Sequence, residues 1–288
     1  MSKVTGLITK LISGEYSVKY GNEYCVCKPR GVFRHKNLAP LVGDMCEIDP
    51  ETKTITKILP RKNSLVRPAC ANVDKVFLVF SVVEPELNLN LLDRMLAYYE
   101  YHGIDCIIIF TKLDLVVDEE VLDKLDEVEK YYNSIGYITH RSKKDLDFEM
   151  IKNDVKDSVC VFAGQSGAGK STLLNLFGFN QKTDQISYAL GRGKHTTRHV
   201  ELLEMGEGLL ADTPGFGIIE LEMDVVSLSQ SFREFFNLSS QCKFGGCTHT
   251  NEPKCKVKEE LENGNILKSR YENYLVFVNE IKTRKVKY

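Results

Sequence analysis

Short runs of alternating apolar and polar residues fill the first part of the chain. A period of two is typical of strands with one buried face. Strands that are this short and closely spaced favour a small β-barrel over alternating strands and helices. Residues 1–68 are therefore predicted to form a barrel of the OB-fold type, with strands that include residues 15–20, 23–28, 45–48 and 54–58.

The pattern changes after residue 72. Long apolar runs, typical of buried parallel strands, now alternate with stretches of helical periodicity. This alternation predicts a doubly wound α/β sheet, whose ligands would lie at the carboxyl ends of the strands. The expected elements are strands at residues 76–80, 106–110 and 137–139 and helices at residues 90–101 and 118–132.

A further apolar run, residues 159–163, leads into a G-x-x-x-x-G-K-S sequence, after which apolar residues recur at helical spacing. Glycines let a backbone bring several N–H groups to one anion, and the start of a helix adds partial positive charge. A glycine-rich turn without a ligand is the alternative, and the strand before and the helix after argue against it. We predict a phosphate-binding P-loop. Its nucleotide-binding residues are Gly164, Gln165, Ser166, Gly167, Ala168, Gly169, Lys170, Ser171 and Thr172.

Within this loop, Lys170 is expected to reach the β- and γ-phosphates, and the Ser171 hydroxyl is expected to bind magnesium.

Thr111, Lys112 and Asp114 directly follow the strand at residues 106–110. A carboxylate at Asp114 can accept two hydrogen bonds from guanine, whereas adenine presents an acceptor where guanine has N1–H. Lys112 would lay its stem over the ring. The alternative is that Asp114 caps a helix, but the P-loop downstream favours a guanine site. Ser142 falls where GTPases place a loop that touches the guanine oxygen.

The apolar run at residues 209–211 ends in Asp212-Thr213-Pro214-Gly215. Asp212 can hold magnesium through water, and the Gly215 amide can contact the γ-phosphate. Thr197, in the polar run before this strand, is expected to close over magnesium and the γ-phosphate, with Thr196 as the alternative. The four residues would also make a good turn on their own, but their place after a buried strand favours a phosphoryl-transfer site.

These parts occur in an unusual order. The guanine motif precedes the P-loop by about fifty residues, whereas in ordinary GTPases it comes last. The order predicts a circularly permuted domain over residues 69–222. The chain would leave this domain through residues 212–217, so that whatever follows is tied to a nucleotide-sensitive loop.

Cys242, Cys247, His249 and Cys255 lie close together in the last part of the chain. Three thiolates and one imidazole suit a closed, structural zinc site, and a reduced loop without metal is the alternative. Residues 223–288 are thus predicted to form a zinc-binding helical domain holding one structural ion. The other cysteines are predicted to be small core residues: Cys25, Cys27, Cys46, Cys70, Cys106 and Cys160.

The net charge of −2 excludes a general basic field, so that any nucleic-acid binding must come from local patches. Basic residues do gather in the second half of the barrel, and the pattern alone fits either an RNA-binding face or an ordinary solvated surface. No apolar stretch reaches the ~18 residues of a membrane span. We expect a cytoplasmic protein without a membrane partner. The basic residues are Lys28, Arg30, Arg34, His35, Lys36, Arg61, Lys62 and Arg67.

Over nearly its whole length, the chain resembles the RsgA (YjeQ-type) small ribosomal subunit biogenesis GTPases of bacteria. The resemblance rests on RKNSLVRP, ANVDKVFLVF, LLDRML, TKLD, GQSGAGKSTLLN, GRGKHTTRH, DTPGFG and CKFGGCTHTNEPKC. It implies an OB-fold, a permuted GTPase domain and a zinc-binding helical domain. It also implies hydrolysis of GTP to GDP with magnesium, stimulated by the small ribosomal subunit during late maturation, with rRNA as the main partner. We expect a monomer.

Catalysis leaves one role unassigned. Ras-like GTPases orient the attacking water with a Gln after Asp-x-x-Gly, but this position is Phe216. His195, two residues before Thr197, is the nearest polar candidate, and the alternative is that it contacts RNA or solvent. A checkpoint protein in which hydrolysis only times release is the second functional reading. An RNA-modifying enzyme is disfavoured because no second catalytic constellation occurs.

Overall fold

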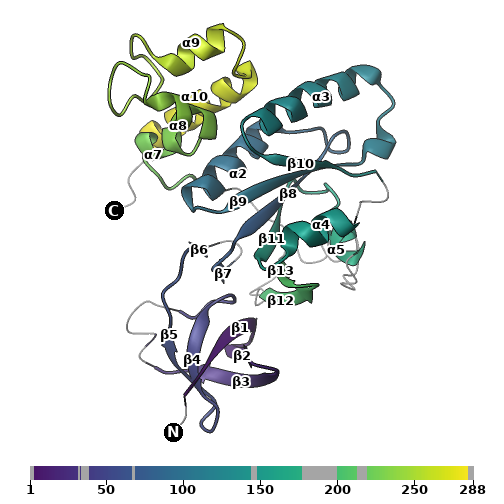
Figure 1. Ribbon diagram of the computed structural model, residues 1–288, viewed down its shortest axis with the longest axis vertical. Coiled ribbons are helices and arrows are strands. Elements are labelled where there is room, and N and C mark those ends of the chain that lie inside the picture. The colour runs from purple at the N-terminus through teal and green to yellow at the C-terminus, as the bar shows by residue number, and fades with distance from the viewer. Residues whose placement is uncertain are drawn as a thin grey trace. The chain divides into compact units, whose positions relative to one another are not determined.

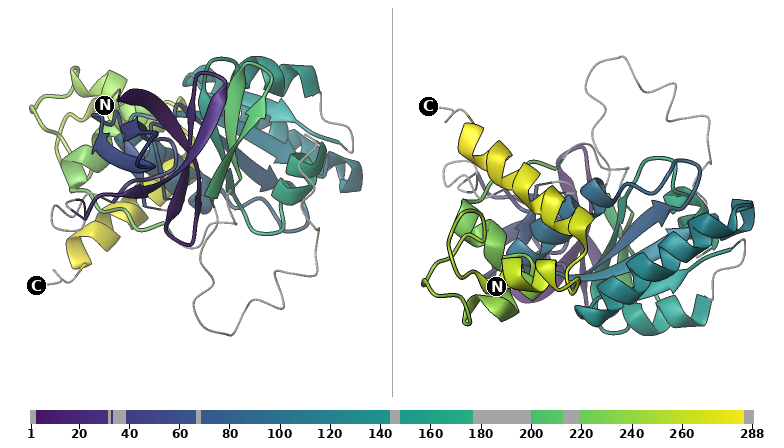
Figure 2. Two further views of the ribbon diagram at one scale, coloured as in Figure 1. Left: turned by 90° about the horizontal axis from the view of Figure 1, so that it is seen from below. Right: turned by 90° about the horizontal axis from the view of Figure 1, so that it is seen from above.

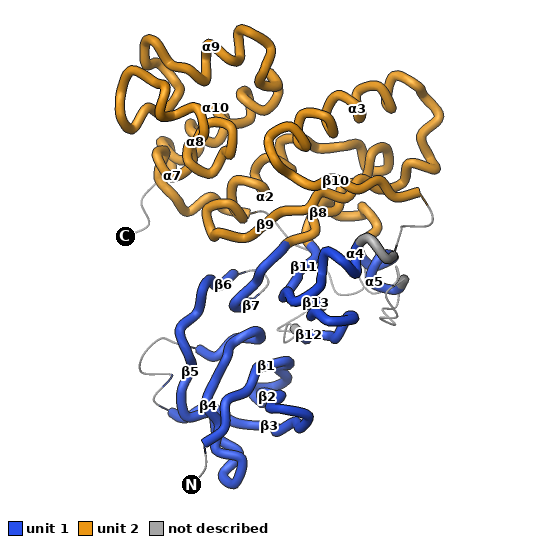
Figure 3. The backbone as a smooth tube through the Cα atoms, in the orientation of Figure 1, with its two compact units in different colours: residues 1–75, 147–162, 170–215 blue, residues 76–146, 163–169, 216–288 orange. Residues whose placement is uncertain are grey.

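The computed structural model describes residues 3–31, 33, 39–66, 69–143, 148–176, 200–212 and 219–284 (Figure 1). The chain divides into two compact units (Figure 3). One unit comprises residues 1–75, 147–162 and 170–215, and the other comprises residues 76–146, 163–169 and 216–288. The predicted boundaries at residues 68 and 222 remain predictions.

The first unit begins with a closed barrel of five strands, which confirms the predicted OB-like barrel. All neighbours pair antiparallel except β3 and β5, whose parallel pairing closes the barrel. Apolar residues and cysteines at alternate positions fill its interior, among them Ile8, Val18 and Cys27. The strands are β1 (Val4–Ile12), β2 (Glu15–Tyr20), β3 (Glu23–Pro29), β4 (Met45–Asp49) and β5 (Thr54–Ile58).

Beyond the barrel, strand β1 also pairs with β12, which the sequence reading missed. β12 forms an antiparallel hairpin with β13, and β13 runs parallel to β11. Within its described residues, the same unit also holds a short ladder of β6 and β7 and the helices α4 and α5. These elements are β6 (Ser64–Leu65), β7 (Cys70–Ala71), α4 (Phe148–Val155), β11 (Val159–Gly164), α5 (Lys170–Leu176), β12 (Val200–Met205) and β13 (Gly208–Asp212).

The second unit contains the strands β10, β9 and β8, in that order, with β10 parallel to β9. The predicted strands and helices of this region are present within two residues of the expected bounds. Their positions are β8 (Lys75–Ser81), α2 (Leu89–Tyr101), β9 (Asp105–Thr111), the short 3-10 helix η1 (Leu113–Leu115), α3 (Glu119–Ser134) and β10 (Ile138–Arg141).

The C-terminal part of this unit is helical and packs on α2. Phe232, Phe235, Tyr274 and Phe277 centre a core that also includes Ala97 of α2. The longest of these helices, α10, packs against α2 and is drawn in yellow in Figure 2 (right). Residues 263–267 separate the last two helices of the described chain. The four helices are α7 (Val225–Gln230), α8 (Arg233–Ser239), α9 (Lys256–Glu262) and α10 (Lys268–Thr283).

None of the helices in the described part of the chain is long and apolar enough to cross a membrane. The six cysteines outside the C-terminal cluster are all buried, as predicted.

Candidate functional site

The glycine-rich loop follows β11 and leads into α5, so the strand and the helix expected on either side are both present. Gly164 has a φ of +126°, and a Cβ there would lie 2.1 Å from the Val79 carbonyl oxygen. Only glycine fits such a position. The N–H of Gln165 donates to the same carbonyl (3.0 Å), and the N–H of Ala168 donates back to the Gln165 carbonyl (3.2 Å). These contacts fold the loop at the carboxyl end of β8.

Thr111 brings the predicted guanine motif to this loop. Its side chain is buried, and its hydroxyl donates to the Ala168 carbonyl at 2.7 Å. The sequence has Thr here where most GTPases have Asn, and the hydroxyl provides a direct tie between the two motifs. Two segments that lie far apart along the chain are thus held side by side.

Asp114 caps neither neighbouring helix. It lies inside η1, which begins after Lys112, and the N-cap of α3 is Asp118. The capping alternative for Asp114 was therefore wrong. Asp114 is exposed, so its carboxylate is accessible to a ligand.

Ser142 lies beside the guanine motif. Its N–H donates to the Phe110 carbonyl (2.7 Å), and its own carbonyl accepts from the Leu113 N–H (3.4 Å). The predicted third contact with a guanine base is therefore next to Asp114 along the backbone, although the side chain of Ser142 is buried.

Lys170 begins α5 and is half-buried, whereas Ser171 and Thr172 are exposed. Burial lowers the pKa of Lys170 to about 8. Removal from water disfavours the charged ammonium, and a nearby phosphate would favour it again. The environment of Lys170 therefore favours binding of an anion, which would stabilise the charged ammonium.

The remaining predicted phosphate and magnesium contacts cannot be placed. Asp212 is the last residue of β13, where it pairs with Glu201. His195, Thr197 and Gly215, with the alternative Thr196, lie outside the described residues. Their roles stay predictions.

A loop that the sequence reading missed also lies at this site. It joins β8 to α2, and its backbone carbonyls accept hydrogen bonds from Lys112 Nζ (at Glu84) and from Gln165 Nε2 (at Glu86, 2.7 Å). A Cβ on Gly167 would lie 3.5 Å from Pro85 Cδ. Its position after a buried strand was the available signal, because ligands of such sheets lie at strand carboxyl ends.

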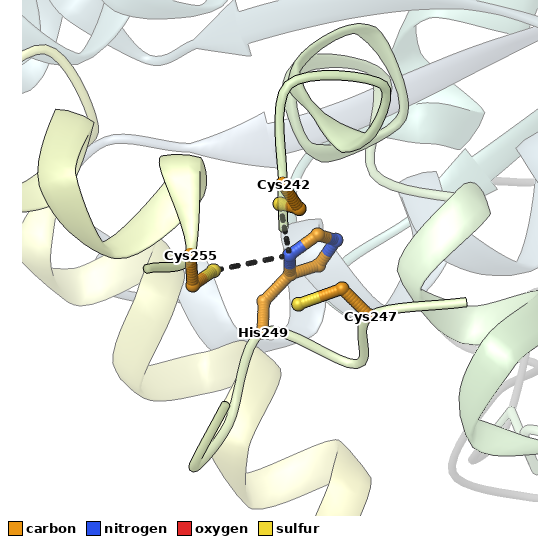
Figure 4. A group of neighbouring side chains, drawn as sticks. All are labelled: Cys242, Cys247, His249 and Cys255. Atoms are coloured by element: carbon orange, nitrogen blue, oxygen red, sulfur yellow. Dashed lines mark hydrogen bonds between the residues drawn. The ribbon is translucent and has the colours of Figure 1, made fainter. Parts of the chain in front are cut away.

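The C-terminal cluster has the geometry of a metal centre (Figure 4). One ligand atom from each of Cys242, Cys247, His249 and Cys255 lies within 4.8 Å of the others. His249 Nδ1 is 3.7 Å from Cys242 Sγ and 3.3 Å from Cys255 Sγ. Tetrahedral zinc places a sulfur and a nitrogen ligand about 3.5 Å apart, so that the set fits a single ion.

The chemistry of these side chains also suits a metal. Burial raises the pKa of Cys247 to about 12 and also raises the pKa of Cys255. Burial lowers the pKa of His249, which keeps the imidazole in its neutral, ligating form. Three thiols and a neutral imidazole stabilise one another only weakly, whereas a bound cation would stabilise the deprotonated thiolates.

Two sets of hydrogen bonds hold the loop between the metal ligands: one joins it to α10, and the other is made by the Glu252 carboxylate within the loop. The hydroxyls of Tyr271 and Tyr274 donate to the His249 and Thr248 carbonyls (2.7 and 2.5 Å). Desolvation of Glu252 is outweighed by hydrogen bonds from Thr248 and Thr250, so that its pKa falls to about 2. The ligands thus sit on a preformed scaffold.

Comparison with known proteins identifies the family. A model described as the RsgA GTPase matches residues 58–222, and one described as the RsgA N-terminal domain matches residues 5–58. The chain belongs to the RsgA GTPase family. It is accordingly a GTP-hydrolysing enzyme, and the RsgA domains together cover the barrel and the region that holds the P-loop and the guanine motif.

Curated RsgA relatives match over nearly the full chain. A protein from Halalkalibacterium halodurans is 45% identical over 287 residues, covering 97% of each chain. One from Geobacillus sp. is 47% identical over 291 residues, covering 98% of this chain and 99% of its own. Both are named small ribosomal subunit biogenesis GTPase RsgA.

Solved RsgA-type structures share the fold. YloQ, described as a circularly permuted GTPase, aligns with a TM-score of 0.84 at 37% identity over 100% of this chain and 98% of its own. YjeQ from Thermotoga maritima aligns with a TM-score of 0.84 at 34% identity, over 99% and 100%. These neighbours support the permuted order inferred from the motifs.

Proposed function

We propose that the chain binds GTP with the loop at residues 164–172 and with Thr111, Lys112 and Asp114, and hydrolyses it to GDP and phosphate on the small ribosomal subunit during late maturation. The hydrogen bond from Thr111 to the Ala168 carbonyl carries this proposal. It holds a phosphate-binding sequence and a base-reading sequence together within one unit, as a guanine nucleotide requires.

The proposed chemistry divides among the predicted residues. Lys170 neutralises charge on the β- and γ-phosphates, and Ser171 and Thr197 bind magnesium directly. Asp212 holds the magnesium through water, and Gly215 contacts the γ-phosphate. His195 positions the attacking water in place of the usual Gln. When bound, magnesium supplies positive charge to the developing phosphate oxygens.

The partner proposed for the barrel is rRNA, because the relatives are named for biogenesis of the small ribosomal subunit. Among the basic residues predicted there, Arg61 has a structural role, because its guanidinium holds the buried Asp44 carboxylate at 2.6 Å. Lys28 lies near the end of β3 and Arg30 directly follows the strand, and the Lys28 ammonium makes a loose ion pair with Glu15 (3.3 Å). The Lys62 ammonium also pairs with a carboxylate, that of Asp74. We therefore propose Lys28 and Arg30 as members of the RNA face.

The Cys242–Cys247–His249–Cys255 cluster is proposed to bind one structural zinc ion. Its closed set of four protein ligands leaves no position for a substrate. We further propose that the protein is a cytoplasmic monomer that exchanges between GTP and GDP.

Turnover with and without purified small ribosomal subunits tests the proposed function. Wild type should hydrolyse GTP slowly alone and much faster with subunits, because Phe216 cannot orient a water molecule. His195→Ala should bind GTP normally and lose most of the stimulated rate. An absence of stimulation would contradict the ribosomal role. An unchanged stimulated rate in His195→Ala would remove His195 from the catalytic residues.

Nucleotide choice is tested by Asp114→Asn. The amide would lose the paired hydrogen bonds to guanine and gain a donor for the 2-oxygen of xanthine, so guanine affinity should fall by about 10²-fold or more and xanthine affinity should rise. Titration with fluorescent GDP and XDP measures both. Asp118→Asn is the matched control, because it changes only the cap of α3. Normal GDP affinity in Asp114→Asn would contradict the assignment.

A further inference from the structure

A cluster of buried charges joins α2 to the metal-binding region of the same unit, that is, helices α7 to α10 and the loop that carries the four metal ligands. Asp93 of α2 and Arg270 of α10 are 0% and 1% exposed. Arg270 Nη1 donates to Asp93 Oδ1 at 2.6 Å, and its Nε and Nη2 donate to Glu234 of α8 at 2.5 and 3.0 Å. One guanidinium thus holds two carboxylates from two different helices.

Further contacts fix α2 against its neighbours. The hydroxyl of Tyr132 in α3 and the amide of Asn273 in α10 also donate to Asp93 (2.6 and 2.7 Å). Nearer the surface, Arg94 of α2 pairs with Glu280 of α10 at 2.9 Å. Buried charges that lose their partners are costly, so α2 cannot slide along α10 without breaking this cluster.

The other end of α2 is tied to the nucleotide site. The loop that precedes it contacts Lys112 through the Glu84 carbonyl and the P-loop through the Glu86 carbonyl, which accepts from Gln165. Two residues after Glu86, the side chain of Asn88 caps α2 by accepting from the Leu91 N–H at 2.9 Å. A movement of this loop would therefore be transmitted directly to the start of α2, because the Asn88 cap joins the loop to the helix.

We infer that α2 reports occupancy of the nucleotide site to the metal-binding region, through the β8–α2 loop at one end and the Asp93–Arg270–Glu234 cluster at the other. This inference rests on the proposed function, because it takes the ligand to be a guanine nucleotide. The contacts to the loop come from the parts of the site assigned to the base and to the inner phosphates. GDP should therefore act as well as GTP, which separates this connection from any signal that leaves through residues 212–217.

The physical basis is that a bound nucleotide orders the P-loop and Lys112, and these two segments hold the Glu84 and Glu86 carbonyls. Energetic coupling of this kind is reciprocal, so removing the contact between α2 and α10 should lower nucleotide affinity by the same factor by which the nucleotide stabilises that contact.

Hydrogen exchange of the full-length, metal-loaded protein tests the inference. In wild type, GDP alone should slow exchange of the α10 amides by about five-fold or more relative to the empty protein, and a non-hydrolysable GTP analogue should slow it at least as much. Asn273→Ala combined with Glu280→Gln should reduce the effect of GDP to under about two-fold and weaken GDP affinity by the factor lost. Arg270→Lys, which keeps the charge but loses the fork of donors, should act in the same direction.

Glu272→Gln is the matched control, because Glu272 pairs only loosely with the exposed Lys268 of the same helix (3.8 Å). It should behave as wild type. The inference is overturned if wild type binds GDP and α10 exchange does not change, or if only the GTP analogue slows it. A wild-type protein that binds no fluorescent GDP would instead overturn the proposed function, and with it this inference, so the two failures are distinguishable.

Discussion

Replacing Lys170 with alanine is expected to abolish GTP hydrolysis. The ammonium is the positive charge that the loop sequence delivers to the β- and γ-phosphates, and it has no substitute among Gly164 to Thr172. Loss of one preorganised stabilising group typically lowers kcat by about 10²–10³-fold, and loss of a full charge should cost more. Single-turnover hydrolysis with small subunits present measures the effect.

Ser171→Ala should give a comparable loss, because it removes the predicted protein ligand of magnesium. Lys156→Ala is the matched control, since Lys156 is an exposed lysine of the same unit that pairs with Glu207 on the surface. It should retain wild-type turnover. A Lys170→Ala protein that hydrolyses GTP at the wild-type rate would contradict the P-loop assignment.

The lowered pKa of Lys170 gives this prediction a second measurement. In the free protein the pKa is about 8, and bound phosphates should raise it. Above that pH, GDP binding must therefore take up a proton, and affinity should fall as pH rises. Well below it the lysine is charged in both states, and affinity should not depend on this group. Calorimetry in buffers of different ionisation enthalpy detects the proton, and Lys170→Ala should take up none there.

Local sequence pattern was sufficient for the barrel and for most of the second unit. Four barrel strands and the helices α2 and α3 have strong, regular periodicity, and they occur within two residues of the expected bounds. β12 was missed because Glu201 and Glu204 flank two adjacent leucines, which breaks the alternation of a strand. Its pairing with β1 depends on residues nearly two hundred positions away.

The break between α9 and α10 has a clear signal in the sequence. Asn263-Gly264 is a breaker sequence, and Gly264 has a φ of +78°. By contrast, nothing local distinguishes Arg270 and Asp93 from solvated charges on a helix surface. Only the partners that tertiary packing brings together from α2, α8 and α10 make their burial possible.

The candidate site shows the same division. Residue types and spacing indicated the P-loop, the guanine motif and the metal ligands. The bond between Thr111 and Ala168 and the contacts of the Glu84–Glu86 backbone could not be predicted, because they join segments through main-chain carbonyls, which carry no sequence signature.

Cys247→Ser is expected to empty the metal site and to remove nucleotide-dependent binding to the small subunit. Structural zinc sites contribute on the order of 10 kcal/mol to the folding of small domains. The Glu252 hydrogen bonds and the two tyrosine hydroxyls also hold the loop between the ligands, but each is worth only about 1–3 kcal/mol, less than the metal. Metal analysis should find about one zinc per chain in wild type and almost none in the variant.

Cys106→Ser is the matched control. Cys106 is also buried, and its thiol points to the Ile104 carbonyl at 3.7 Å, so a serine hydroxyl can donate there. This variant should keep its metal. Both variants should still bind GTP, because no residue assigned to the nucleotide is among the metal ligands. Loss of GTP binding in Cys247→Ser would indicate general unfolding instead of local loss of the loop.

The functional consequence follows from where the metal loop is attached. It is fastened to α10 by Tyr271 and Tyr274, and the residues after Asp212 lead directly into the helices that surround it. Contacts of Thr197 and Gly215 with the γ-phosphate should therefore bias this region. Wild type should co-sediment with small subunits more tightly with a non-hydrolysable GTP analogue than with GDP, by a coupling of about 1–3 kcal/mol. Cys247→Ser should bind weakly and equally in both states. Equal binding of wild type with both nucleotides would contradict a γ-phosphate switch and would leave a constitutive RNA binder whose GTPase activity serves another step.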